Sequence, residues 1–250
     1  MKKILLSLSL VIQLSFSATT EQVEQYIIVS KADADLISME QMIDDIIPSN
    51  STKNTEIISI RFNEYLEKNL TQSEILELIK LHKNPLLQTL RELDSDLPDE
   101  ELKEFNASLI ENPLSSERLE LNKKIIKNIF DDKDLKNMMY GLEGKFTQLL
   151  GQDETSKIFT KEDEKTFVSE IQEELMLPIL YSTQTLSMEE LKELKNLTDR
   201  PIIRKANKVE LNATMYALED FLQSMIAGMM NSFIEEATKD NPLLQNLIEE

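Results

Sequence analysis

The chain contains no cysteine and no tryptophan, and only one histidine and four glycines occur among its 250 residues. Without cysteine no disulfide can form, so the fold must be stabilised by the burial of apolar side chains. The common zinc ligand sets of cysteine and histidine are excluded. A Ser-His-Asp triad would have to use His82, for which a structural place near the end of a short helix is the simpler interpretation.

Motifs for other metal sites are also missing. A di-iron bundle needs Glu-x-x-His on two helices, but Ile79 stands three residues before His82. The run from Asp94 to Asp96 begins like a calcium loop, but Pro98 stands where the next oxygen ligand is needed. We therefore predict no catalytic residue, no cofactor and no metal site.

Basic residues are few relative to acidic ones. The chain has 27 Lys and Arg against 46 Asp and Glu, which gives a net charge of −19. The acidic residues are spread along the chain, so a solvated acidic surface explains most of them. This charge disfavours nucleic acid and anionic lipid surfaces as partners, while it permits basic partners or divalent cations.

The first 17 residues have the pattern of a secretory signal peptide. Lys2 and Lys3 precede the mostly apolar run 4–16, and the small residues Ser15 and Ser17 have the spacing that signal peptidase accepts. The apolar run is shorter than the roughly 20 residues that a spanning helix needs. We expect cleavage near Ser17 or Ala18, a periplasmic location, and no membrane span in the mature chain.

Strand signals are absent, and apolar residues instead recur at the three- and four-residue spacing of helices. The sequence predicts an all-α, multi-helix bundle. Twelve helical spans are predicted, and about ten helices are expected because some of the spans can fuse. The approximate spans are 21–30, 33–47, 54–69, 72–82, 85–94, 98–111, 113–130, 133–150, 162–182, 188–198, 201–238 and 242–249.

An Asn-Pro pair occurs three times and predicts three helix starts. Asparagine caps a helix N-terminus with its side-chain oxygen, and proline suits the first helical position because no N–H is needed there. The pairs are Asn84-Pro85, Asn112-Pro113 and Asn241-Pro242.

An ungapped repeat relates residues 65–85 to residues 181–201. Seven pairs of identical residues are separated by 116 positions: Tyr65/Tyr181, Leu70/Leu186, Glu74/Glu190, Glu77/Glu193, Leu78/Leu194, Leu81/Leu197 and Pro85/Pro201. Each copy contains a predicted capping box, in which Thr71 pairs with Glu74 and Ser187 pairs with Glu190. The apolar pairs Ile75/Leu191, Leu78/Leu194 and Leu81/Leu197 lie three residues apart on one helix face and are predicted to be buried.

A weaker match pairs Asp35, Leu36 and Met39 with Asp134, Leu135 and Met138. Together the two matches predict a bundle built from two related helical-hairpin modules. Their ranges are 18–125 and 130–250, and the two modules can also pack as one domain.

The first copy resembles an exported proteobacterial family called domain of unknown function 2059. The resemblance lies in Phe62-x-x-Tyr65, Leu70-Thr71-x-x-Glu74-Ile75 and the run from Leu78 to Pro85. Here Leu81-His82 replaces an aromatic pair of the family pattern, Asn84 replaces a serine and Leu87 replaces a glycine. The resemblance implies an all-α fold and export, and it supplies no catalytic residue.

Three functional hypotheses remain open at this stage. The first is a non-catalytic periplasmic protein that binds an unknown protein partner or serves envelope homeostasis. The second is a binding module for an apolar ligand or peptide, with a Met-rich groove at Phe221, Met225, Met229, Met230 and Phe233, although helical spacing alone predicts such a stripe and favours an ordinary core helix. The third is a carboxylate-based enzyme acting on wall glycans. The sequence does not predict the oligomeric state.

Overall fold

The computed structural model describes residues 17–34, 36, 52–90, 99–149 and 159–219. Regular structure within these ranges consists of helices, which confirms the predicted all-α fold. They are α2 (Thr20–Ser30), α4 (Thr52–Asn69), α5 (Gln72–His82), α6 (Pro85–Thr89), α7 (Asp99–Glu111), α8 (Ser116–Ile129), α9 (Asp132–Leu149), α10 (Lys161–Glu174), α11 (Met176–Ser182), α12 (Met188–Thr198) and α13 (Pro201–Ala217). The predicted spans 33–47 and 242–249 lie almost wholly outside the described residues, as do Asn241-Pro242 and the part of the predicted span 201–238 that follows residue 219.

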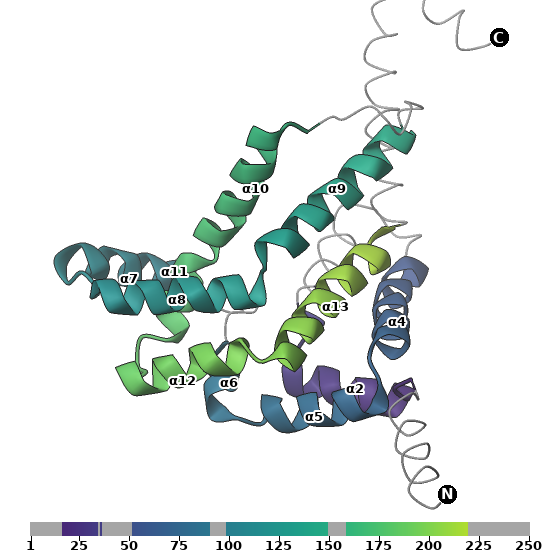
Figure 1. Ribbon diagram of the computed structural model, residues 1–250, viewed down its shortest axis with the longest axis horizontal. Helices are drawn as coiled ribbons and strands as arrows, with labels where there is room; N and C mark the ends of the chain where they lie inside the picture. Colours follow the sequence, from purple (N-terminus) through teal and green to yellow (C-terminus); the bar gives the residue numbers. More distant parts are fainter. Residues whose placement is uncertain (1–16, 35, 37–51, 91–98, 150–158, 220–250) are drawn as a thin grey trace, which may run out of the picture.

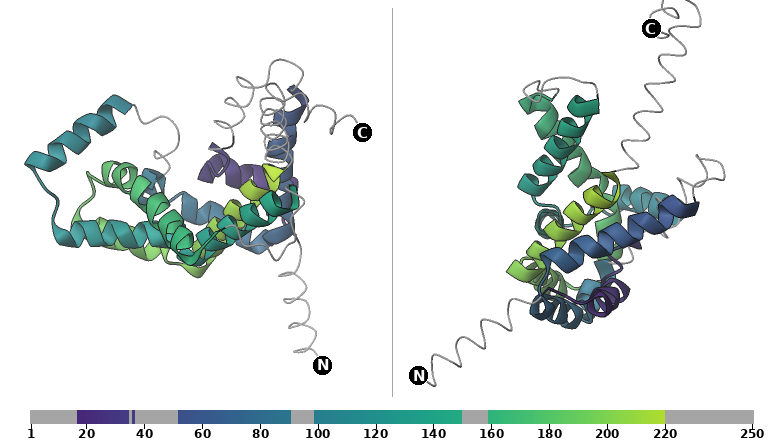
Figure 2. Two further views of the ribbon diagram at one scale, coloured as in Figure 1. Left: turned by 90° about the horizontal axis from the view of Figure 1, so that it is seen from above. Right: turned by 90° about the vertical axis from the view of Figure 1, so that its right-hand side faces the viewer.

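The helices form two neighbouring groups (Figure 1). In the first, α2 packs on α5 and α4, and α13 packs along α4. In the second, α8 packs on α12 and α11. Figure 2 shows α7 at the outer end of the second group, where it contacts α11. Helices α9 and α10 contact each other, and α9 also contacts α13.

Both predicted capping boxes are present. The Thr71 hydroxyl accepts a hydrogen bond from the backbone N–H of Glu74, and the Glu74 carboxylate accepts one from the N–H of Thr71. Ser187 and Glu190 repeat the same exchange at the start of α12. Each box satisfies two N–H groups that have no partner within the helix, which fixes where α5 and α12 begin.

The prediction for Asn112-Pro113 is wrong, whereas the one for Asn84-Pro85 is confirmed. The Asn84 side chain accepts a hydrogen bond from the N–H of Leu86, with Pro85 at the first helical position. Helix α8 instead begins at Ser116, because the hydroxyl of Ser115 caps it by accepting from the N–H of Arg118. Serine and asparagine cap about equally well, so the local motif alone does not decide between them.

The span predicted as one helix at 162–182 is divided into α10 and α11. Helix α10 ends at Glu174, Leu175 forms the break, and α11 begins at Met176. Proline at position 178 has no N–H to donate to the Glu174 carbonyl, and its ring crowds that carbonyl. The break is therefore a local effect of Pro178 that the apolar periodicity does not reveal.

A single cluster of buried apolar side chains draws on both predicted modules. In the first module Ile75 and Leu78 are fully buried, and the matching residues of the second, Leu191 and Leu194, are fully buried too. Burying each such side chain contributes about 1.5–3 kcal/mol relative to exposure. The repeated positions thus form helix faces that are held by burial, as the spacing predicts.

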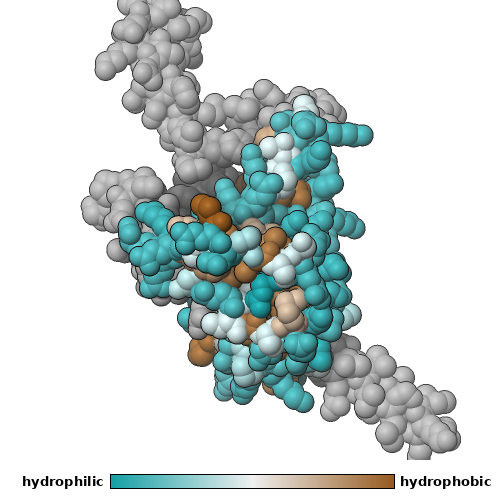
Figure 3. Space-filling model, turned by 90° about the vertical axis from the view of Figure 1, so that its left-hand side faces the viewer, coloured by the Kyte–Doolittle hydropathy of each residue, from teal (hydrophilic) through white to brown (hydrophobic). Residues whose placement is uncertain are grey.

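The face of the described residues shown in Figure 3 is mostly hydrophilic, with smaller apolar areas between the hydrophilic side chains. Among the described residues, the large apolar side chains that are exposed lie on different helices, with Ile28 on α2, Ile60 on α4, Leu76 on α5, Ile110 on α7 and Tyr140 on α9. None of the described helices combines the length and the apolar character needed to cross a bilayer.

Candidate functional site

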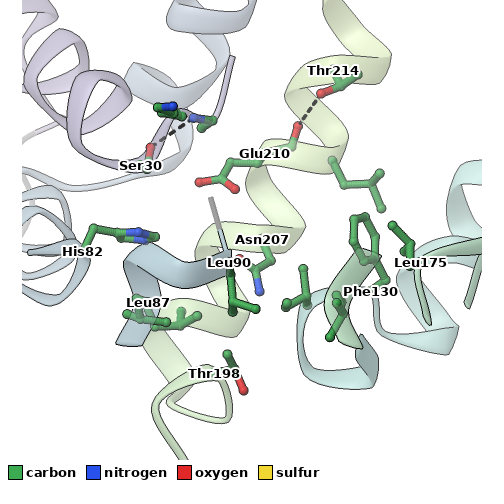
Figure 4. A pocket seen from close by; sticks show the side chains of 16 residues that line it. Ser30, His82, Leu87, Leu90, Phe130, Leu175, Thr198, Asn207, Glu210 and Thr214 are labelled. Carbon is green, nitrogen blue, oxygen red and sulfur yellow. Dashed lines mark hydrogen bonds between the residues drawn. The ribbon is translucent and has the colours of Figure 1, made fainter. Parts of the chain in front are cut away.

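A cavity of about 330 Å³ lies between the two groups of helices. Its walls come from the ends of α2, α5 and α8, from α6, from the α10–α11 junction and from one side of α13 (Figure 4). The described residues that line it are Ser30, Lys31, Ala32, His82, Leu87, Leu90, Ile129, Phe130, Leu175, Ile179, Thr198, Ile203, Asn207, Glu210, Leu211 and Thr214.

Matching positions of the predicted repeat meet at this cavity. His82 and Thr198 end α5 and α12 and are separated by 116 positions, as are Leu87 and Ile203 near the starts of α6 and α13. The cavity therefore lies where the ends of corresponding helices from the two modules come together.

The ends of α2 and α8 also correspond, with a separation of 99 positions. The N–H of Lys31 donates to the carbonyl of Ile27, and the N–H of Phe130 donates to the carbonyl of Ile126. Lys31 adopts a left-handed backbone conformation, with φ of 52°, whereas Phe130 does not. Both residues that end these helices border the cavity, so helix termination shapes two of its walls.

One side of the cavity is apolar. Phe130 follows α8, Leu175 forms the break between α10 and α11, and Ile179 is fully buried within α11. Leu87 and Leu90 close the same space from α6 and the residue that follows it. These side chains offer dispersion contacts and no hydrogen bond, so this part of the cavity suits an apolar group.

The other side carries a cluster of polar side chains centred on Glu210. The hydroxyl of Tyr26, a fully buried residue, donates a hydrogen bond to Oε1 of Glu210. The ring of Tyr26 also packs edge-on against the imidazole of His82, with centroids 5.5 Å apart and an interplanar angle of 74°. Three residues from α2, α5 and α13 thus meet at one end of the cavity.

Burial raises the pKa of the Glu210 carboxyl above its usual value of 4.5, although the hydrogen bond from Tyr26 opposes this shift. Part of the Glu210 side chain remains accessible, because it borders the cavity. A carboxyl group that has lost bulk water favours its neutral form until a partner stabilises the charge. The protonation state of Glu210 therefore depends on what occupies the cavity.

His82 ends α5, as predicted, but the sequence did not place it beside Tyr26 or in a cavity wall. The proposed groove residues Phe221, Met225, Met229, Met230 and Phe233 lie outside the described residues.

Glu210 and Tyr26 were missed as candidates, although the sequence carries a signal for Glu210. On α13 the buried residues Ile203, Ala206 and Ala213 define an inward stripe, and Glu210 is the acid within it. An acidic residue at helical spacing among buried apolar ones is a recognisable sign of a functional carboxyl. Tyr26 offers no comparable signal, because a tyrosine in an apolar stripe fits a core position equally well.

Among the described residues that line the cavity, Glu210 is the one carboxylic acid. Two-carboxylate glycoside hydrolysis therefore lacks its second acid within this part of the site, and that hypothesis stays a prediction. No group of three or more acidic or histidine side chains with metal-binding geometry occurs in the described ranges.

Comparison with known proteins gives no analogue of this cavity. The chain matches no protein-family model, and no curated protein or solved structure matches it significantly.

Proposed function

We propose that this protein is a non-catalytic binding module that holds a small ligand in the cavity between its two groups of helices. The observation that carries the proposal is the open volume of about 330 Å³ at a place where helices otherwise pack closely. Well-packed interiors leave few voids larger than a water molecule. A space that could hold about ten water-sized groups is therefore a candidate binding site.

The lining supports a ligand that is mainly apolar. Pockets for small molecules are typically lined by apolar side chains with a few polar groups that fix orientation. Phe130, Leu175 and Ile179 provide the first kind of contact, and Glu210 provides the second. The volume is near the lower end of the usual range of about 300–1,000 Å³, so the ligand is small.

The periplasm is the proposed place of action, on the strength of the predicted signal peptide at residues 1–17. The resemblance to the exported family of unknown function agrees with that location and remains a proposal. Binding of an unidentified protein partner also remains a prediction. The exposed apolar residues of the described helices are spread over several elements and do not favour this alternative.

The test compares ligand binding by the unaltered mature chain with binding by a variant in which a larger side chain fills the cavity. Native mass spectrometry of freshly purified protein should show a small co-purified ligand, and a fluorescent apolar probe should bind with saturable affinity. Leu211→Trp should weaken probe binding about tenfold or more, because the larger side chain fills the cavity that Leu211 lines.

The matched control is Ile110→Trp, which adds the same ring to an exposed position of α7 outside the cavity lining. This variant should bind the probe like the unaltered protein. Equal binding by both variants and the unaltered chain would show that the probe does not use this cavity, and absence of any saturable binding would refute the proposed function.

A further inference from the structure

We propose that the cavity selects a ligand with a cationic amine head group on a short apolar body, and that Glu210 supplies the counter-charge. The inference depends on the proposed binding function and deepens it by naming the ligand's chemical class. It is carried by the geometry of one carboxyl group and by the arrangement of the charges around it.

Glu210 is held in position to meet a ligand. It reaches from α13 into the cavity, with its carboxyl group on the side where Ser30 and His82 lie (Figure 4). Tyr26 fixes the carboxyl group by donating to Oε1. The backbone carbonyl of Glu210 accepts a hydrogen bond from the Thr214 hydroxyl at 3.1 Å. A fixed carboxyl bordering an open space is preorganised for a donor that enters that space.

The basic residues of α13 are committed to other acids. Arg204 pairs with Asp131 at 2.8 Å, Lys205 pairs with Glu74 at 2.6 Å, and Lys208 pairs with Asp134 at 2.9 Å. No lysine or arginine of the described residues forms a salt bridge with Glu210, although Arg204, Lys205 and Lys208 share its helix. Within the part of the chain that the structure describes, no basic side chain balances the charge that this carboxyl carries when it is ionised.

A cation satisfies this site better than a neutral or an anionic head group. An ammonium group forms charge-assisted hydrogen bonds with a carboxylate, which are roughly twice as strong as neutral ones. An alcohol would gain only the weaker bond. A carboxylate would meet repulsion from Glu210 and from a protein of net charge −19, which raises the local concentration of cations.

Two other titratable groups border the cavity, and both would oppose the binding of a cation. Lys31, at the end of α2, lines the cavity and would attract an anionic head group. His82, at the end of α5, would repel a cation when protonated and lies against Tyr26. The choice between an amine and a carboxylate is therefore a choice between Glu210 and Lys31 as the anchor, and it can be measured directly.

The experiment compares octylamine, octanol and octanoate, which share one apolar body, by titration calorimetry on the unaltered mature chain near neutral pH. Octylamine should bind about tenfold or more tightly than octanol, and octanoate should bind most weakly. Glu210→Gln should reduce octylamine affinity to about that of octanol and leave octanol affinity unchanged. Glu193→Gln removes the same charge from an exposed position of α12 and should alter neither affinity.

The outcomes separate the inference from the function. Equal binding of octylamine and octanol, or tighter binding of octanoate, would overturn the amine inference and leave ligand binding intact. Absence of binding by all three ligands would refute the amine inference, and the proposed function as well if the apolar probe also fails to bind. The three-ligand comparison uses the unaltered chain, so it remains decisive even if Glu210→Gln does not fold.

Discussion

The two predicted modules share a helical scaffold but contribute different chemistry to the cavity. Where the first module has Tyr26 on α2 and His82 on α5, the corresponding positions of the second are Ile125 on α8 and Thr198 on α12. The core positions Leu78 and Leu194 are meanwhile the same residue. The scaffold position is thus kept, whereas His82 and Thr198, which both line the cavity, are different residues.

The second module has its own buried polar group, but it serves packing. At the position matching Val23 it carries Asn122, whose side-chain oxygen accepts a hydrogen bond from the Thr183 hydroxyl at 2.9 Å. Arg118 donates to the carbonyls of Thr183 and Leu186 and thereby fastens the α11–α12 turn to α8. These groups satisfy one another, whereas Glu210 borders open space. The contrast is one reason for the proposed role of Glu210 in ligand binding.

The largest expected effect tests whether the two modules depend equally on the shared core. Leu78→Ala and Leu194→Ala should each lower the free energy of unfolding by about 2–5 kcal/mol, because both leave a cavity in a fully buried site. Urea denaturation followed by circular dichroism measures the loss. Leu76→Ala, at a position that is 51 % exposed, should cost far less. A negligible loss of unfolding free energy for one of the two core variants would show that the two modules do not depend equally on the shared core.

A smaller effect concerns the pH dependence that Glu210 introduces into the first group of helices. Its pKa is raised on folding, so the folded chain binds the proton more tightly than the unfolded chain does. The stabilising contribution is complete below the usual value of 4.5 and is lost as the pH rises through the folded pKa. Relative to Glu210→Gln, the unaltered protein should therefore lose stability as the pH rises above that value.

Thermal unfolding of both proteins from pH 4 to pH 8 measures this difference, and subtracting the two curves cancels the many other acids. Tyr26 donates to the Glu210 carboxyl, and His82 and Lys31 line the same cavity, so a His82→Gln background removes any contribution of the imidazole from the difference. A difference curve that is flat or rises with pH would contradict the burial of Glu210.

The smallest effect sharpens the comparison at the helix starts. Thr71→Ala and Ser187→Ala should each cost about 1 kcal/mol, since each removes the side-chain oxygen of a capping box. Chemical denaturation should give similar losses for the two variants. Glu74 also pairs with Lys205, so a much larger loss at Thr71 would show that the first box is coupled to the packing of α13.

Local rules in the sequence predicted most of the helices. Capping residues and apolar spacing placed the starts of α5 and α12 correctly, because both signals act within one or two helical turns. Asn112-Pro113 misled because Ser115 offers an equally good cap three residues later. The break at Leu175 was missed, although Pro178 is a local signal that was available.

The sequence by itself therefore determined the all-α class, most of the helices and the buried face of each repeated helix. Only the tertiary structure decided the cavity, because its polar end joins Tyr26 to Glu210 across 184 positions of the chain. Apolar periodicity predicts which face of a helix is buried, but it does not predict which distant helix packs on that face. Packing α2, α5 and α13 together turned a tyrosine and a glutamate on inward faces into a candidate site.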